Sequence, residues 1–291
     1  MDADKHARQD EDEMPSKVAY VPYYPDSRGN RLECWTTSED QGGHILWLRG
    51  PEPVAMQILS ADHTYEALPR SVAAGSSWTH ALKSGAATPS PNIVRLLDLL
   101  KAVVTLPTPG GTEFALALDW YKIPQEGIDP FEWANTETAN LINRGKYRSN
   151  NNPTEQAKYG IALVDKLCGV IDAHPTLQRI EVVIDVPGHD SKRVSFGSRV
   201  ANTVAIRRGA EFVRTQAKSE FRPEAKSLSP PQRDEHLVNE FSVSNDVGGK
   251  TVLVVDDVFR SGASMASVAM TARAAGASAV FGLCGVRTMR R

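Results

Sequence analysis

The stretch that decides the fold reads Val252-Leu253-Val254-Val255-Asp256-Asp257-Val258-Phe259-Arg260-Ser261-Gly262-Ala263-Ser264-Met265. It opens with an almost continuously apolar run, which is typical of a parallel strand buried on both faces. Two acids follow this run at its carboxyl end, where open α/β sheets bind their ligands. A short Ser/Gly turn then leads at once into an amphipathic segment. We therefore expect a strand, a ligand-binding turn and a helix, in that order.

The surrounding sequence repeats this alternation of strand and helix. Working outward, the pattern predicts a helix from about Thr154 to Ala173, a strand at Ile180–Ile184, a helical stretch near Ser198–Arg208, and strands at Thr251–Val255 and Ala279–Cys284. Gly276 is expected to close the helix that begins near Met265. Alternating strands and helices predict an α/β fold, a parallel sheet flanked by helices, over residues 126–291.

The first part of the chain has a different character. Residues 1–16 are dense in charge and poor in large apolar side chains, so we expect a disordered tail. Residues 17–125 predict a mixed α+β region of unknown role, with short strands at Val18–Val21, Ile45–Leu48 and Phe114–Leu118 and a helix after Pro91. The Ser-, Ala-, Gly- and Pro-rich residues 69–91 suggest irregular structure.

This first part also carries a group of aromatic residues, namely Tyr20, Tyr23, Tyr24, Trp35 and Trp47. We expect them mainly to pack in a core, although they could instead form a surface for a protein or nucleic-acid partner.

Composition excludes several classes of protein. A formal charge of −2 over 291 residues gives no global reason to expect DNA or an anionic membrane as the main partner. Cys34, Cys168 and Cys284 lie far apart, so neither a zinc site nor a disulfide framework is expected, and a reducing cytosol fits. With no signal-like or membrane-length apolar run, we expect a cytoplasmic protein.

The acids and the turn after them offer two kinds of recognition in one element. Gly262 permits a tight turn, and the amides of Ser261–Ser264 can point at an anion with the support of the helix dipole. Adjacent carboxylates suit the neighbouring hydroxyl groups of a sugar. The plainer alternative is a solvated strand end followed by a helix-capping serine.

This arrangement resembles the phosphoribosyl pyrophosphate signature of type I phosphoribosyltransferases: an apolar strand, two acids, a spacer, then Thr/Ser-Gly-x-Thr/Ser. The resemblance implies the type I phosphoribosyltransferase fold, with Asp256 and Asp257 on the ribose hydroxyls. It assigns the 5-phosphate to Arg260, Ser261, Gly262, Ala263 and Ser264.

Flanking residues narrow the resemblance to the ComF-like branch of that family and extend it over roughly residues 135–291. They are Leu228-Ser229, Arg233 and Phe241, together with Asn143–Tyr147, which is similar to a Lys-x-x-Tyr segment of the branch. His236 stands where the branch usually has Asn, the four-cysteine zinc module is missing, and Phe196–Arg199 is the nearest counterpart of an Arg-Gly-Phe-Asn run.

Two further loops are predicted to complete the site. The loop after Ile184 would face the pyrophosphate, with Gly188, His189, Lys192 and Arg193 as its binding residues, unless it is a solvated basic turn. The polar stretch Arg214–Val238 has the length of a lid, although it could also be a surface insertion.

The resemblance implies a glycosyltransferase of nucleotide metabolism, in which a nitrogen nucleophile displaces pyrophosphate from C1 of the ribose. Mg²⁺ is the implied cofactor, carried on the pyrophosphate with no metal ligand from the protein. Asp256, Asp257, Lys192 and Arg193 are the candidate catalytic residues, and a homodimer is an option. The alternative is a sensor that binds the ligand without turnover, or an accessory factor in DNA uptake or genome defence. A P-loop kinase and a Rossmann dehydrogenase are disfavoured because their glycine motifs are missing.

Overall fold

A computed structural model describes residues 31–125, 127–129, 131–148, 152–188, 194–217, 241–243 and 247–289. The predicted tail, the predicted strand Val18–Val21 and three of the aromatic residues (Tyr20, Tyr23 and Tyr24) lie outside these ranges. Within the described residues, no helix combines the length and the apolar character needed to cross a bilayer.

The centre of the molecule is a six-stranded sheet in the order β5-β6-β12-β11-β7-β8. Its strands are β5 (Val104–Thr105), β6 (Ala115–Trp120), β7 (Val182–Asp185), β8 (Glu211–Val213), β11 (Thr251–Phe259) and β12 (Ala279–Arg287). All neighbouring pairs are parallel except β5 with β6. The predicted α/β fold with a parallel sheet is therefore confirmed.

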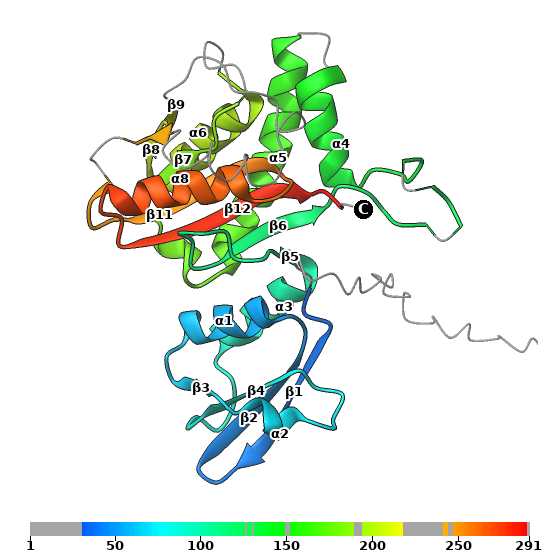
Figure 1. Cartoon of the computed structure of the whole chain (residues 1–291), viewed down its shortest axis with the longest axis vertical. Coiled ribbons are helices and arrows are strands. Elements are labelled where there is room, and N and C mark those ends of the chain that lie inside the picture. Colours follow the sequence, from blue (N-terminus) through cyan, green and yellow to red (C-terminus); the bar gives the residue numbers. More distant parts are fainter. Residues whose placement is uncertain are drawn as a thin grey trace, which may run out of the picture.

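Helices cover both faces of this sheet, as Figure 1 shows. One face carries α4 (Glu137–Asn143), the π-helical turn η1 (Arg144–Arg148), α5 (Pro153–Ala173), the 3-10 turn η2 (Leu177–Arg179) and α6 (Phe196–Arg208), and the other carries α8 (Ala263–Ala274). Along β11, Leu253 and Val255 belong to the core under α5 and α6, whereas Val252 and Val254 belong to the core under α8. This alternation is the period of two expected when a strand is buried on both faces.

The N-terminal region forms a second, antiparallel sheet in the order β1-β2-β4-β3. Its elements are β1 (Cys34–Asp40), β2 (Gly43–Arg49), α1 (Glu52–Ala61), β3 (Tyr65–Ala67), α2 (Arg70–Ala73), β4 (His80–Ser84) and α3 (Pro91–Ala102). The predicted strand Ile45–Leu48 and the helix after Pro91 are confirmed as β2 and α3. In α3, Ser90 caps the first turn by accepting from the amide of Ile93 at 3.3 Å.

Residues 69–91 are irregular only in part, because α2 and β4 lie within them. β4 is a central strand that pairs with β2 on one side and β3 on the other. Its sequence, His-Ala-Leu-Lys-Ser, has only two consecutive buried apolar residues, Ala81 and Leu82. Tertiary pairing, rather than local propensity, therefore makes this segment a strand.

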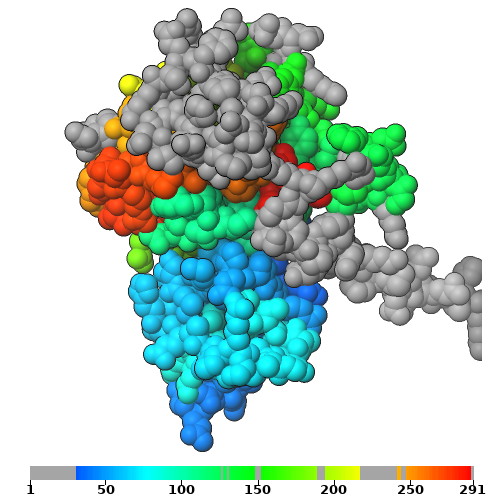
Figure 2. All heavy atoms as spheres, viewed as in Figure 1, coloured from blue at the N-terminus to red at the C-terminus, as the bar shows by residue number. Residues whose placement is uncertain are grey.

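The two parts of the chain share one continuous hydrophobic core. Leu46 of β2 and Leu97 of α3 belong to the same buried cluster as Leu167 of α5 and Leu283 of β12. Figure 2 shows the N-terminal part, blue to cyan, seated directly against the part that holds the main sheet. The main sheet also takes in β5 and β6, which precede residue 126, so it reaches across the predicted boundary between the regions.

Candidate functional site

The candidate site lies at the carboxyl ends of the neighbouring strands β7 and β11, where the chain leaves the two strands in opposite directions. After β7 the chain passes through α6 on one face and returns as β8, on the far side of β7 from β11. After β11 it passes through α8 on the opposite face and returns as β12, on the far side of β11 from β7. Such a switch point is where open α/β sheets bind ligands, outside the carboxyl ends of the strands. The predicted ribose and pyrophosphate loops are the two that leave it.

The turn after β11 has the conformation that the sequence predicts. Gly262 has a φ of +83° and is the N-cap of α8. A Cβ at this position would lie 2.6 Å from the ring of Phe259, so glycine is required by both the backbone and the packing. Among the described residues no side chain caps α8. The exposed Ser261 and the partly exposed Ser264 flank the open amide end of the helix.

The two acids lie inside the last part of β11, since strand pairing continues to Phe259 and does not stop at Val255 as predicted. Alternation along the strand directs Asp257 toward the face of α6 and Asp256 toward the face of α8. Asp257 is only 4% exposed, whereas Asp256 is partly exposed. The neighbouring acids are thus inequivalent, and Asp256 is the one open to a ligand.

Asp256 has an unusual protonation equilibrium. Desolvation by the surrounding protein and then the charge of Asp257 raise the pKa of Asp256 to about 7, against the smaller opposing effect of Lys146. Its carboxylate accepts a hydrogen bond from the backbone amide of Asp257 at 2.8 Å. A carboxyl group with a pKa near neutral pH, at the switch point of an open α/β sheet, is a candidate functional residue.

Lys146 joins the site, although it was not among the predicted site residues. It lies in η1, and its Nζ is 2.5 Å from Oδ2 of Asp257. Burial by itself lowers the pKa of Lys146, but the charge of Asp257 and the hydrogen bond to it outweigh burial and raise that pKa. The only signal in the sequence was the similarity of Asn143–Tyr147 to a family segment, and that similarity did not indicate that Lys146 pairs with Asp257.

The start of α6 connects the two predicted loops. Ser195 caps α6 by accepting from the amide of Ser198 at 3.0 Å, and a Cβ at Gly188 would lie 3.0 Å from Cβ of Ser195. A Cβ at Gly197 would lie 3.6 Å from the carboxylate of Asp257. Gly188, at the start of the predicted pyrophosphate loop, is therefore linked through the first turn of α6 to the acids of β11.

A buried carboxylate fixes the base of that loop. Asp185 at the end of β7 is fully buried, accepts from the amide of Thr215 at 2.8 Å, and is bonded by the hydroxyl of Ser198. The hydroxyl of Thr215 donates to the backbone oxygen of Asp185 at 2.8 Å. These bonds hold β7, α6 and the segment after β8 together at the carboxyl end of β7.

A buried cation lies beside the end of β11. Arg287 pairs in register with Phe259, is 1% exposed, and places its guanidinium 5.3 Å from the ring of Trp120 and 5.8 Å from that of Phe259. Cation–π contacts of this kind stabilise a guanidinium that has lost its water. Nothing in the local sequence signals that Arg287 is buried.

Several predicted residues lie outside the described ranges. They are His189, Lys192 and Arg193 of the pyrophosphate loop, Leu228, Ser229, Arg233 and His236 of the family pattern, and most of the predicted lid. Phe241 of that pattern is described: it is buried in β10 (Phe241–Ser242), which pairs with β9 (Gln216–Ala217). Arg260 is described and exposed.

The described residues do not form a metal cage. They contain no cluster of three or more His, Cys, Asp or Glu side chains that could hold an ion. Asp256 and Asp257 offer the oxygen ligands that Mg²⁺ prefers, but Lys146 already neutralises Asp257. A metal ion held by these protein groups alone does not fit.

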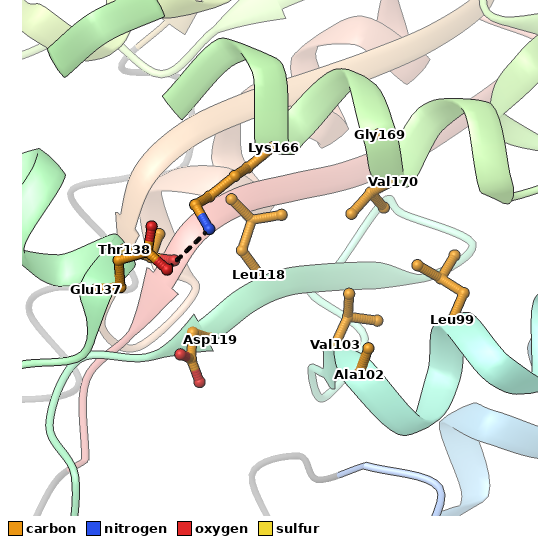
Figure 3. Close-up of a pocket in the computed structure, with 10 residues that line it drawn as sticks. All are labelled: Leu99, Ala102, Val103, Leu118, Asp119, Glu137, Thr138, Lys166, Gly169 and Val170. Atoms are coloured by element: carbon orange, nitrogen blue, oxygen red, sulfur yellow. Dashed lines mark hydrogen bonds and ion pairs between the residues drawn. The ribbon is translucent and has the colours of Figure 1, made fainter. Parts of the chain in front are cut away.

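Two other candidate features, a hollow and a polar cluster, lie away from Asp256 and Asp257. A hollow of about 300 Å³ lies between α3, β6, α4 and α5. Its apolar wall includes Leu99 and Val170, which Figure 3 labels. Its polar edge holds Asp119 and an ion pair between Lys166 and Glu137 at 3.2 Å.

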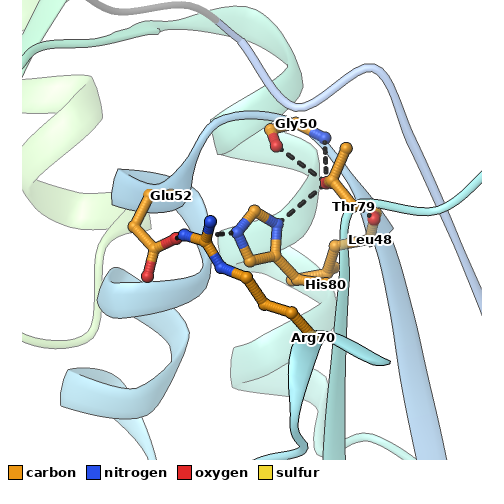
Figure 4. Close-up of polar contacts among 6 residues, drawn as sticks. All are labelled: Leu48, Gly50, Glu52, Arg70, Thr79 and His80. Carbon is orange, nitrogen blue, oxygen red and sulfur yellow. Dashed lines mark hydrogen bonds and ion pairs between the residues drawn. The ribbon is translucent and has the colours of Figure 1, made fainter. Parts of the chain in front are cut away.

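The second feature is a line of hydroxyl, imidazole and carboxylate groups in the N-terminal region (Figure 4). Thr79 Oγ1 is 2.8 Å from His80 Nδ1, and His80 Nε2 is 3.2 Å from Glu52, which also pairs with Arg70. However, the Thr79 hydroxyl also donates to the carbonyl of Gly50 at 2.8 Å and accepts from its amide at 3.0 Å. The hydroxyl is committed to the backbone, so the cluster fastens β4 to the end of β2.

No protein-family model and no curated protein matches the sequence. Among solved structures, orotate phosphoribosyltransferase from Aeropyrum pernix is similar at 19% identity, over 48% of this chain and 63% of that one, with a TM-score of 0.31. Phosphoribosylpyrophosphate synthetase from Mycobacterium smegmatis is similar at 23% identity over 43% and 33%, with a TM-score of 0.29. Adenine phosphoribosyltransferase from Saccharomyces cerevisiae is similar at 15% identity over 68% and 89%, with a TM-score of 0.33.

The chain therefore spans less than two thirds of the length of the first two of these proteins. At such scores the likeness carries no argument of its own. The case for a function rests on the residues of the site.

Proposed function

We propose that the carboxyl end of β11 and the turn into α8 bind the ribose 5-phosphate end of phosphoribosyl pyrophosphate. The observation that carries the proposal is the position of Asp256, a partly exposed acid at a switch point, near the end of the strand whose following turn leads into the open amide end of α8. An acid accepts from sugar hydroxyls, and uncapped amides donate to a phosphate. The number of residues between the acids and the Ser-Gly turn is the same as in the family signature, in which the acids bind the ribose hydroxyls and the turn binds the 5-phosphate.

In this proposal the protein is a phosphoribosyltransferase in which a nitrogen nucleophile displaces pyrophosphate from C1. Asp256 accepts from the ribose hydroxyls, and the amides of Gly262, Ala263 and Ser264 hold the 5-phosphate with Ser261 and Arg260 beside them. The negative charge of the acids favours a sugar ring that becomes cationic as the bond to pyrophosphate lengthens. Catalysis then comes from positioning and electrostatics, without a covalent intermediate on the protein.

The pyrophosphate would bind at the loop after β7. Gly188 begins this loop beside the cap of α6, and His189, Lys192 and Arg193 are proposed to neutralise the leaving group. Mg²⁺ would arrive bound to the phosphates of the ligand and would supply further positive charge there. The ComF-like affiliation, a cytoplasmic location, and a nucleic-acid or protein partner for the N-terminal region are part of the same proposal.

Two measurements on the full chain test this function. Calorimetry with phosphoribosyl pyrophosphate and Mg²⁺ should give saturable binding to the wild type and a loss of roughly tenfold or more in Asp256→Asn, since a hydrogen bond to a charged group contributes about 1.5–3 kcal/mol. Release of pyrophosphate is then followed with a panel of nucleobases and other nitrogen acceptors.

The outcomes separate the candidate functions. Release with one acceptor supports the transferase and identifies its substrate. Binding without release across the panel favours the alternative sensor. Absence of binding to folded wild-type protein contradicts both.

A further inference from the structure

Three segments distant in sequence meet at the buried acid of β11. Oδ2 of Asp257 is 2.5 Å from Nζ of Lys146, and the same carboxylate faces the first turn of α6 at Gly197. The side chains are largely enclosed, with 6% of Asp257 and 24% of Lys146 exposed. An enclosed pair of this kind has a fixed geometry, unlike an ion pair on the surface.

The turn that delivers Lys146 is itself tightly packed. η1 is π-helical, a conformation that is rare and frequent at functional sites. Gly145 lies so close to Phe196, the first residue of α6, that a Cβ there would be 2.4 Å from its ring. Packing of η1 on α6 therefore places Lys146 at the carboxylate.

We propose that Lys146 is a positioning residue of the sugar site: it holds Asp257 against the start of α6, and its positive charge favours the ionised form of the neighbouring Asp256, which accepts from the ribose hydroxyls. This inference rests on the proposed function. It divides the acid pair into an anchored member, Asp257, and a member that accepts from the ligand, Asp256. Lys146 itself need not touch the ligand.

The charges around the pair support this division. Without Lys146, two adjacent carboxyl groups with little water around them would compete for one negative charge, as like charges do at short range. Other charged or titratable groups lie near the pair. Cys284 pairs in register with Asp256 on β12, which also carries Arg287, and Asp185 of β7 pairs in register with Val255. Arg260 follows β11 in the turn, and Tyr147 is next to Lys146 in η1. The guanidinium of Arg287 lies near the rings of Trp120 and Phe259, and the ammonium of Lys146 forms an ion pair with Asp257.

The direct test follows the titration of Asp256 by carbon NMR of aspartate-labelled full-length protein without any ligand. In Lys146→Met the pKa of Asp256 should rise by roughly one unit, since the charge of Lys146 lowers that pKa and a nearby opposite charge shifts a carboxyl by about one unit or more. Lys146→Arg should restore most of the shift. Lys166→Met is the matched control, because Lys166 pairs with Glu137 away from the acids, and it should change nothing.

A second variant protects the test against misfolding. Asp257→Asn removes the competing charge and should move the pKa of Asp256 downward, opposite to Lys146→Met. If Lys146→Met folds and the pKa of Asp256 is unchanged in it, the inference is overturned. If Lys146→Met does not fold, an unchanged pKa of Asp256 in Asp257→Asn overturns it.

Ligand binding then links the titration to the site. The lower pH limit for binding of phosphoribosyl pyrophosphate with Mg²⁺ should move upward in Lys146→Met by the same interval as the titration. A shifted titration with an unmoved binding limit would show that Lys146 does not serve the sugar site. Failure of the wild type to bind at every pH contradicts the proposed function instead, so the two failures are distinguishable.

Discussion

Replacement of Gly262 by alanine tests the turn on which the sugar-phosphate site depends. Gly262 has a φ of +83°, and its Cβ would lie 2.6 Å from the ring of Phe259. Gly42, in the turn between β1 and β2, has the same φ of +83° but nothing within 4 Å of its Cβ. Comparison of Gly42→Ala with Gly262→Ala therefore separates the destabilisation caused by the left-handed backbone from that caused by the clash with Phe259.

The expected magnitudes follow from this geometry. Gly42→Ala should lower the free energy of unfolding by about 1–2 kcal/mol, the cost of a left-handed conformation for an L-residue. Gly262→Ala should lose that amount and a further ~1–3 kcal/mol for overpacking against Phe259. Urea unfolding of the two variants measures the difference directly. Binding of phosphoribosyl pyrophosphate should weaken in Gly262→Ala alone, because only there do the amides of the turn move.

A third variant checks the source of the extra loss. In the double variant Gly262→Ala/Phe259→Leu, the smaller side chain should relieve part of the clash, so the two changes should couple favourably in a double-mutant cycle. Equal losses of stability in Gly42→Ala and Gly262→Ala, or independent effects of Gly262→Ala and Phe259→Leu, would refute the reasoning.

Three further predictions concern packing and pH. Gly145→Ala should lower the free energy of unfolding by about 1–3 kcal/mol, because its methyl group collides with Phe196; wild-type stability in urea would contradict the contact. The raised pKa of Asp256 means that its contribution to stability is complete below about pH 4 and is lost as pH rises through about 7, so Asp256→Asn should flatten the loss of stability between about pH 4 and 7. Burial lowers the pKa of His174 to about 3, so its contribution is present above pH 6.5 and is lost as pH falls through about 3. His174→Gln should therefore lessen acid unfolding, and an unchanged acid limb would count against a neutral buried imidazole.

The core of the site could be predicted because its signals are local. The apolar run, the acids and Gly262 lie within fifteen residues, and each constrains the backbone by itself. The predicted end of the strand at Val255 is wrong, because acids at a strand end suggest a loop. Pairing of β11 with β12 as far as Phe259 carries the strand past both acids.

The rest depends on contacts between distant segments. Lys146 and Asp257 belong to elements far apart in the chain, and no periodicity or spacing links a lysine in a π-helical turn to a particular carboxylate. β4 is likewise a strand because β2 and β3 flank it. The packing of Leu97 and Leu167 into one core, which joins the N-terminal region to the main sheet, has the same origin.

A titration with phosphoribosyl pyrophosphate and Mg²⁺, followed by backbone amide NMR, measures which amides bind the 5-phosphate. The amide resonances of Gly262, Ala263 and Ser264 should show the largest saturable shifts, with smaller ones along α8. Saturable shifts confined to other parts of the molecule, or none in a folded sample, would contradict the assignment of this turn as the phosphate site.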